Sequence, residues 1–210
     1  MATADTPWAV IGAGSWGTAL AIQFARAGHP VRLWGRDPAQ QAAMAQGRCN
    51  MRYLPDAPFP PGLEAVATLD QALDGALDVL VAVPSHALRA VLHTLAPRLL
   101  QGSRVAWATK GFELETGLLP HQVAREVLGI DRSMAVLSGP TFAREVGSGL
   151  PTAMTVAFAI GSAGSAGGAG YNIGRFPLDS QSASMGGGTT FAVAGGTFSS
   201  MSARSRSMLS

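Results

Sequence analysis

The stretch WAVIGAGSWG, residues 8–17, decides the fold of this chain. Its first four residues are apolar and predict a short buried strand. Glycines then follow at positions 12, 14 and 17, in the spacing G-x-G-x-x-G, and the apolar residues beyond them recur at helical intervals up to residue 27. A strand, a glycine turn and a helix in this order predict the opening unit of an α/β domain.

Each glycine of this turn has its own physical role in binding a dinucleotide. Gly12 permits the tight turn, Gly14 lets the backbone approach a pyrophosphate, and Gly17 lets the helix pack closely on the strand. The helix N-terminus at Ser15 and Trp16 offers unpaired N–H groups and the positive end of the helix dipole. A glycine-rich loop without function is the alternative, and the flanking strand and helix argue against it.

Up to about residue 157 the chain alternates between strand-like and helix-like segments. This alternation predicts a Rossmann-type, doubly wound, mainly parallel sheet with helices on both faces. We expect strands at 8–11, 31–34, 78–83, 104–108 and 134–137, and helices at 15–27, 38–46 and 85–96, the last with Ser85 as its N-cap.

The composition changes after residue 157. From there to residue 210 Gly, Ser and Ala dominate, Asp179 is the only acidic residue after position 158, and lysine is absent. Such a segment cannot bury enough apolar surface to offset the entropy lost on ordering. We therefore expect residues 1–157 to form a nucleotide-binding domain and residues 158–210 to form a disordered or weakly structured tail.

Charge and cysteine content exclude several classes of protein. The net charge is +2, only 13% of residues are charged, and no run of Lys or Arg occurs, so we expect no nucleic-acid binding. No uninterrupted apolar run reaches the ~18 residues of a membrane helix, so we expect no membrane insertion.

Cys49 is the only cysteine, which fits a reducing, cytoplasmic setting. No metal-ligand spacing is present, and we expect no metal.

The end of the second predicted strand bears on the choice of cofactor. An acidic residue at this point would bind the ribose 2′-hydroxyl of NAD, whereas Trp34 is followed here by Gly35, Arg36 and Asp37. Gly35 leaves room and Arg36 can meet a 2′-phosphate, which favours NADP. Asp37 can still reach a ribose, so NAD stays open. A solvated surface arginine is the alternative reading of Arg36.

Lys110 is the only lysine among fifteen Lys and Arg residues. It comes just past the predicted strand 104–108, at the sheet edge where ligands of α/β proteins bind. A Lys ammonium is a compact charge whose pKa can shift, unlike that of Arg. From composition alone, a role toward an anionic ligand and a chance surface lysine are equally good interpretations.

Six stretches, in this order, resemble those of bacterial NAD(P)-dependent glycerol-3-phosphate dehydrogenases: VIGAGSWGTALA, LWGRDP, NMRYLP, VAVPSHALR, ATKGFE and LSGPTFAREVGSGLPTAMTVA. The resemblance runs from residue 8 to residue 157. Rossmann dehydrogenases that act on other hydroxy or keto acids share the glycine turn but not the TKG and SGPTFA stretches, which argues against that reading.

The resemblance implies an activity and a set of contacts. These enzymes reversibly reduce dihydroxyacetone phosphate to sn-glycerol 3-phosphate, a precursor of phospholipids, with NADP or NAD. An ammonium at position 110 would neutralise the substrate phosphate or polarise its carbonyl. Carried over by motif, the cofactor would contact the glycine turn and Ser15, Trp16, Arg36, Lys110 and Ala143, and the substrate would contact Lys110, Gly139 and Thr141.

The chain also departs from the family. The family continues into a helical second domain with a GALKN-like stretch, whose lysine is the proposed proton donor and acceptor, and nothing after residue 157 resembles it. We therefore assign no catalytic residue and expect impaired turnover. A reading-frame shift near codon 158 or a truncated gene is our hypothesis, and a divergent tail is the alternative.

Loss of that domain also bears on association and function. The uncovered apolar surface would favour association, so a homo-oligomer is among the expected states. A non-catalytic NADP-binding module is the alternative function.

Overall fold

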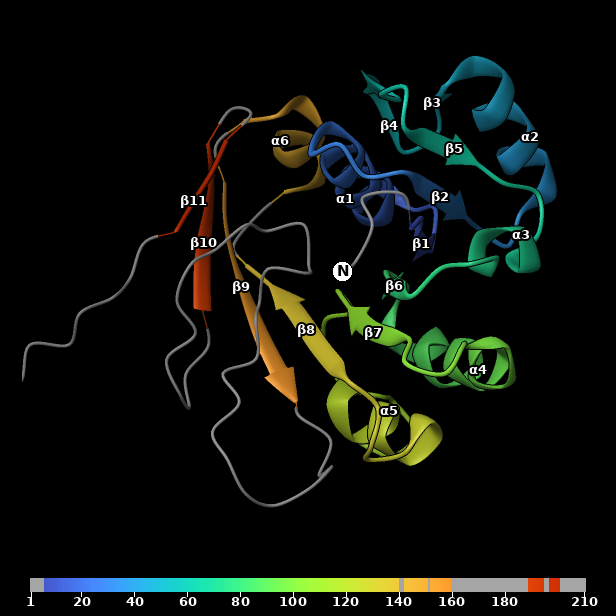
Figure 1. Ribbon diagram of the computed structural model, residues 1–210, viewed down its shortest axis with the longest axis vertical. Coiled ribbons are helices and arrows are strands. Elements are labelled where there is room, and N and C mark those ends of the chain that lie inside the picture. Colours follow the sequence, from blue (N-terminus) through green and yellow to red (C-terminus); the bar gives the residue numbers. More distant parts are fainter. Residues whose placement is uncertain (1–5, 140–141, 151, 160–188, 195–196, 201–210) are drawn as a thin grey trace, which may run out of the picture.

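The computed structural model describes residues 6–139, 142–150, 152–159, 189–194 and 197–200 (Figure 1). Nine strands of the described residues form one sheet: β1 (Trp8–Ile11), β2 (Val31–Trp34), β5 (Leu63–Ala65), β6 (Asp78–Val81), β7 (Arg104–Trp107), β8 (Met134–Ser138), β9 (Thr152–Ala159), β10 (Thr189–Ala194) and β11 (Thr197–Ser200). The strands β5-β2-β1-β6-β7-β8 are neighbours in this order and all their pairings are parallel. This order is that of a Rossmann sheet and confirms the predicted fold class.

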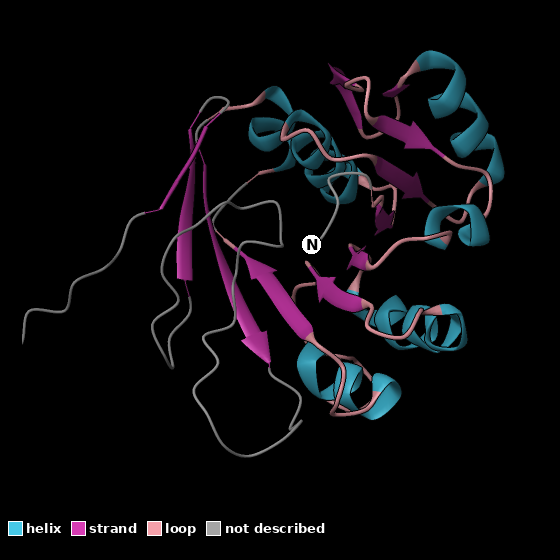
Figure 2. Cartoon of the chain, viewed as in Figure 1, coloured by secondary structure: helices cyan, strands magenta, loops and turns pink. Residues whose placement is uncertain are grey.

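Helices cover both faces of the parallel strands (Figures 1 and 2). They are α1 (Ser15–Arg26), α2 (Pro38–Gly47), α3 (Leu69–Leu73), α4 (Ser85–Leu95), α5 (Pro120–Leu128) and α6 (Ala143–Ser148). Successive strand residues point to opposite faces. Val10 therefore belongs to a core shared with α1, α2 and α6, whereas Ala9 and Ile11 belong to a second core shared with α3, α4 and α5. The two cores fix both sides of the glycine turn that follows β1.

Several elements differ from the sequence expectation. Pro84 is the N-cap of α4 and Ser85 is its first residue, so the predicted Ser85 cap is wrong by one position. The predicted strand 78–83 ends earlier, at Val81, and a short turn of 3-10 helix, η1 (Ala96–Arg98), follows α4. The small antiparallel pair β3 (Cys49–Asn50) and β4 (Leu54–Pro58) was not predicted.

The far edge of the sheet is antiparallel. β9 pairs with β8 and β10, and β10 pairs with β11. Residues 189–194 and 197–200, in the segment expected to be mostly disordered or weakly structured, thus form strands of this sheet. Thr, Phe and Val in these segments favour strands, and β10 pairs with the side of β9 that faces away from β8. Residues 160–188, 195–196 and 201–210 lie outside the described residues. β9 crosses residue 157, and the domain division placed there stays a prediction.

Arg89 connects α4 to α5 and to the segment before α5. Its guanidinium donates hydrogen bonds to both carboxylate oxygens of Glu113, each at 2.8 Å, and to Glu126 at 2.8 Å. The hydrogen bonds from Arg89, and then the one from Thr116, lower the pKa of Glu113 from 4.5 to about 2. The ionised Glu113 carboxylate thus joins the segment before α5 to α4 through Arg89.

This ion pair predicts a pH dependence of stability. Because the pKa of Glu113 is lower in the folded state, its contribution is complete above pH 4.5 and is lost as the pH falls toward 2. We expect Glu113→Gln to flatten the fall of the thermal midpoint across this window, measured by circular dichroism. Glu64→Gln, at an exposed position on β5, should keep the wild-type profile. Equal profiles for wild type and Glu113→Gln would contradict the assignment.

Candidate nucleotide-binding site

Steric contacts fix the glycine turn between β1 and α1. Gly12 has a φ of +120°, and a Cβ at this position would lie 2.4 Å from the carbonyl oxygen of Ala82. A Cβ on Gly17 would lie 1.9 Å from the carbonyl oxygen of Gly12. At Gly14, by contrast, an added Cβ would meet nothing within 4 Å beyond its own chain neighbours. Packing therefore requires the first and third glycines, and Gly14 lies on the open side of the turn.

The N-terminus of α1 opens onto this space without a side-chain cap. Gly14 is the N-cap residue. The N–H groups of Gly14, Ser15 and Trp16 have no backbone acceptor among the described residues, and that of Thr18 donates to the Gly14 carbonyl at 3.0 Å. Unpaired N–H groups and the positive end of the helix dipole together attract an anion. Ser15 and Trp16, two of the predicted contacts, thus belong to a helix N-terminus whose N–H groups are available to an anion.

A cationic residue, Arg36, follows β2, the strand that pairs with β1. Arg36 is exposed and makes no hydrogen bond or ion pair with any described residue. The Asp37 carboxylate instead accepts hydrogen bonds from the N–H groups of Ala39 at 3.0 Å and Gln40 at 3.2 Å, as the N-cap of α2. Asp37 also lies 3.4 Å from Arg52. The Asp37 carboxylate, which could have bound a ribose, is thus engaged in capping α2. Arg36 is available to bind a ligand.

Gly35 has a second role beyond leaving room for a ligand. A Cβ at this position would lie 2.8 Å from the Cβ of Ala13 in the glycine turn and 3.0 Å from Nε2 of Gln41. Part of the space is therefore filled by the protein itself. A side chain at position 35 would push the turn away from β2.

Three of the predicted site residues meet at the carboxyl edge of the sheet. The Nζ of Lys110 donates a hydrogen bond to the Gly139 carbonyl at 3.2 Å and lies 5.7 Å from the centroid of the Trp16 ring. Lys110 follows β7, Gly139 follows β8 and Trp16 belongs to α1. Such an ammonium above an aromatic face is favourable. The exposed lysine thus faces the same edge as the open N-terminus of α1.

The remaining predicted contacts belong to the segment after β8. Ala143 is the first residue of α6, is half-buried and packs against the core that contains α1. The side chain of Gln23 in α1 donates to the carbonyl of Val146 in α6, which joins the two helices. Thr141 lies outside the described residues, and its predicted substrate contact stays a prediction.

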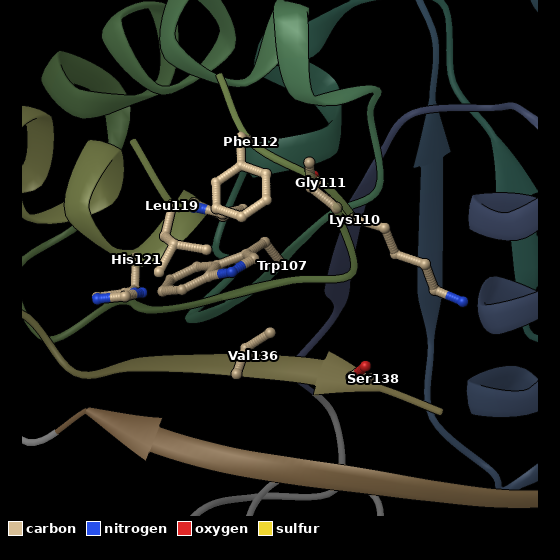
Figure 3. Close-up of a pocket in the computed structure, with 10 residues that line it drawn as sticks. Trp107, Lys110, Gly111, Phe112, Leu119, His121, Val136 and Ser138 are labelled. Atoms are coloured by element: carbon tan, nitrogen blue, oxygen red, sulfur yellow. The ribbon is translucent and has the colours of Figure 1, made fainter. Parts of the chain in front are cut away.

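A pocket of about 320 Å³ lies next to Lys110, on the α5 side (Figure 3). In Figure 3 the Lys110 side chain extends away from Trp107 and Leu119. The ammonium therefore points toward Gly139 and Trp16, and the lining of the pocket is mainly apolar. Its lining residues are Trp107, Thr109, Lys110, Gly111, Phe112, Leu119, Pro120, His121, Val136 and Ser138.

Sequence reasoning missed two residues that contact the turn. Asn50 is fully buried, and its side-chain amide donates to the Ala13 carbonyl at 3.0 Å. The amide of Gln40 donates to the same carbonyl at 2.9 Å. Asn50 stands in the NMRYLP stretch quoted for the family resemblance, but no periodicity marked it as buried.

The described part of the chain has neither a candidate metal centre nor a candidate membrane-spanning helix. Among these residues, no group of three or more His, Cys, Asp or Glu side chains could hold a metal ion. None of the described helices has the length and apolarity needed to cross a bilayer.

Known proteins match most of this chain. The family model "NAD-dependent glycerol-3-phosphate dehydrogenase N-terminus" matches residues 7–163. Glycerol-3-phosphate dehydrogenase [NAD(P)+] of Thioalkalivibrio sulfidiphilus is 59% identical over 151 residues, covering 72% of this chain and 45% of that protein. The same enzyme of Sodalis glossinidius is 58% identical, covering 73% of this chain and 45% of that protein.

A solved structure agrees with these relatives. The glycerol-3-phosphate dehydrogenase of Coxiella burnetii superposes with a TM-score of 0.71 at 42% identity, covering 74% of this chain and 47% of that one. The chain thus spans less than half the length of the relatives that it matches. With the turn, the strand order and the matched residues in agreement, the chain belongs to the family of NAD-dependent glycerol-3-phosphate dehydrogenases, as their amino-terminal domain.

Proposed function

We propose that this chain binds NADP or NAD at the glycine turn, as the nucleotide-binding part of an enzyme that reduces dihydroxyacetone phosphate to sn-glycerol 3-phosphate. One observation carries the proposal: the uncapped N-terminus of α1, with unpaired N–H groups at Gly14, Ser15 and Trp16, opens beside the ammonium of Lys110. This arrangement suits the pyrophosphate of a dinucleotide. The names of the relatives support both the cofactor and the reaction.

Different residues of the chain bind different parts of the cofactor and the substrate. The N-terminus of α1 binds the pyrophosphate, and Arg36 binds a 2′-phosphate. Lys110, Gly139 and Thr141 hold the substrate, and the ammonium of Lys110 stabilises negative charge on the phosphate or the carbonyl oxygen. A bound reduced nicotinamide supplies the hydride. We assign no general acid, which is typically worth 10²–10⁴-fold in rate, so we expect the 210-residue polypeptide to bind cofactor with little turnover.

The setting of the reaction is part of the same proposal. Cys49 is the only cysteine, is buried and forms no disulfide, which suits a reducing cytoplasm. The product would supply the backbone of phospholipids.

We also propose that residues 1–157 act as the binding domain, and that the chain associates with copies of itself through exposed apolar residues such as Phe112 and Leu114.

A substitution at Arg36 tests both the cofactor site and its preference for NADPH over NADH. We expect wild type to bind NADPH more tightly than NADH, and Arg36→Ser to weaken NADPH binding by about 10–100-fold while sparing NADH. The guanidinium would pair with the 2′-phosphate, which NADH lacks. Nicotinamide fluorescence titrations measure the four dissociation constants.

The control is Arg125→Ser, which removes one charge from the exposed face of α5 and should leave both constants unchanged. Absence of binding to either dinucleotide would refute the proposed function. Equal losses for NADPH and NADH would refute the role of Arg36 alone. Rapid reduction of dihydroxyacetone phosphate by the purified chain would contradict the expected impairment.

A further inference from the structure

The carbonyl group of Ala13, inside the glycine turn, accepts two side-chain hydrogen bonds. Asn50 Nδ2 lies 3.0 Å from this oxygen and Gln40 Nε2 lies 2.9 Å from it. A carbonyl oxygen has two lone pairs, so both are used. The donors come from β3 and α2, outside the strand-turn-helix unit itself. The turn is therefore held by a neighbouring part of the chain as well as by its own glycines.

Other contacts fix the orientation of Asn50. Its Nδ2 also donates to the hydroxyl of Thr18 at 2.8 Å, and its Oδ1 accepts from the N–H of Tyr53 at 3.3 Å and from Gln40 at 3.4 Å. Both hydrogens and the oxygen of the amide thus have partners. With none of its surface exposed, Asn50 cannot exchange them for solvent.

Holding this carbonyl has a consequence for the ligand side of the turn. In a trans peptide unit the C=O of one residue and the N–H of the next point in opposite directions. Fixing the Ala13 oxygen toward Asn50 and Gln40 therefore directs the N–H of Gly14 the other way. That N–H has no backbone acceptor among the described residues and belongs to the proposed pyrophosphate site. A rotation of this peptide unit would remove one donor from the site.

We propose that Asn50, together with Gln40, is a positioning residue that holds the turn in the conformation that binds pyrophosphate, without touching the cofactor. This inference rests on the proposed binding of a dinucleotide. Asn50, in the NMRYLP stretch, thereby acts on the cofactor site through its hydrogen bond to the Ala13 carbonyl.

Three variants of the full chain separate this role from general support of the fold. Asn50→Asp replaces the amide donor with a carboxylate that faces the Ala13 oxygen. Gln40→Met removes the second donor to that oxygen. Thr18→Val is the matched control, because it removes the other acceptor of the same Asn50 amide and leaves the contact with Ala13. Calorimetry with NADP⁺ gives the dissociation constants, and thermal melts give stability.

We expect Asn50→Asp to weaken NADP⁺ binding about tenfold relative to wild type at pH 8, and Gln40→Met by a smaller factor. Thr18→Val should lower the melting temperature but keep the dissociation constant within about twofold. The dissociation constant of Asn50→Asp for NADP⁺, divided by that of wild type, should return toward one at pH 6. Burial raises the pKa of a carboxyl at this position, and its protonated form can again donate to Ala13.

Equal weakening by Thr18→Val and Asn50→Asp would overturn the inference, since it would show general support of α1. The inference would also be overturned if wild type binds NADP⁺ and both Asn50→Asp and Gln40→Met bind it with the wild-type dissociation constant. If Asn50→Asp does not fold, Gln40→Met and Thr18→Val decide the matter in the same way. A wild type that binds no dinucleotide would instead refute the proposed function on which the inference rests.

Discussion

Replacing Gly17 with alanine should abolish cofactor binding and lower the free energy of unfolding by about 3 kcal/mol, the upper part of the range for overpacked sites. The added Cβ would lie 1.9 Å from the carbonyl oxygen of Gly12 and 3.2 Å from the Cβ of Ala82. Both contacts are with groups that cannot swing aside as a flexible side chain can. Helix α1 would therefore move away from β1 and take the phosphate-binding N–H groups with it. Urea denaturation and NADPH titration measure the two effects.

Gly14→Ala is the matched control within the same turn. A Cβ at position 14 would meet nothing within 4 Å beyond its own chain neighbours, and the φ of Gly14 is −78°, which any residue adopts. We expect stability within about 0.5 kcal/mol of wild type and a loss of NADPH affinity of about tenfold or more, because the methyl group stands where the pyrophosphate would approach. A Gly17→Ala chain as stable as wild type would contradict the packing argument.

These two glycines show why the centre of the fold could be predicted from sequence. β1 is a short apolar run, β1 and its neighbour β6 are buried on both faces, and the turn that follows β1 needs glycine for reasons of local geometry. The missed elements are different in kind. β3 and β5 have only two and three residues, too few for a period to appear. Helix α3 did carry a usable signal, the capping box of Thr68 and Gln71.

The site was predictable only in part, for a related reason. The glycine turn could be predicted from spacing, and Lys110 and Gly139 were assigned through family resemblance, although 29 residues separate them. Asn50 and Gln40 gave no such signal, because their importance depends on a tertiary contact with Ala13. The Asp37 carboxylate was read as a candidate ribose ligand, but a local helix cap engages it. Polar residues near strand ends often have such local partners.

Replacing Lys110 with methionine should weaken NADPH binding by about 10–100-fold, the usual range for a lost hydrogen bond to a charged group. Stability should stay within about 0.5 kcal/mol of wild type, as for surface substitutions generally. Lys110 is exposed, and its ammonium makes one hydrogen bond, to the Gly139 carbonyl, among the described residues. Nicotinamide fluorescence titration and thermal melts check the two expectations separately.

Lys110→Arg distinguishes charge from geometry. Arginine keeps the positive charge but presents a planar fork in place of a compact ammonium. If charge alone matters, this variant should bind NADPH as wild type does. We expect an intermediate loss, because a planar guanidinium on a longer side chain cannot place its charge at the same point, 3.2 Å from the Gly139 carbonyl. Wild-type affinity in Lys110→Met would show that the ammonium only joins β7 to β8, and the anion site would then rest on the N-terminus of α1 alone.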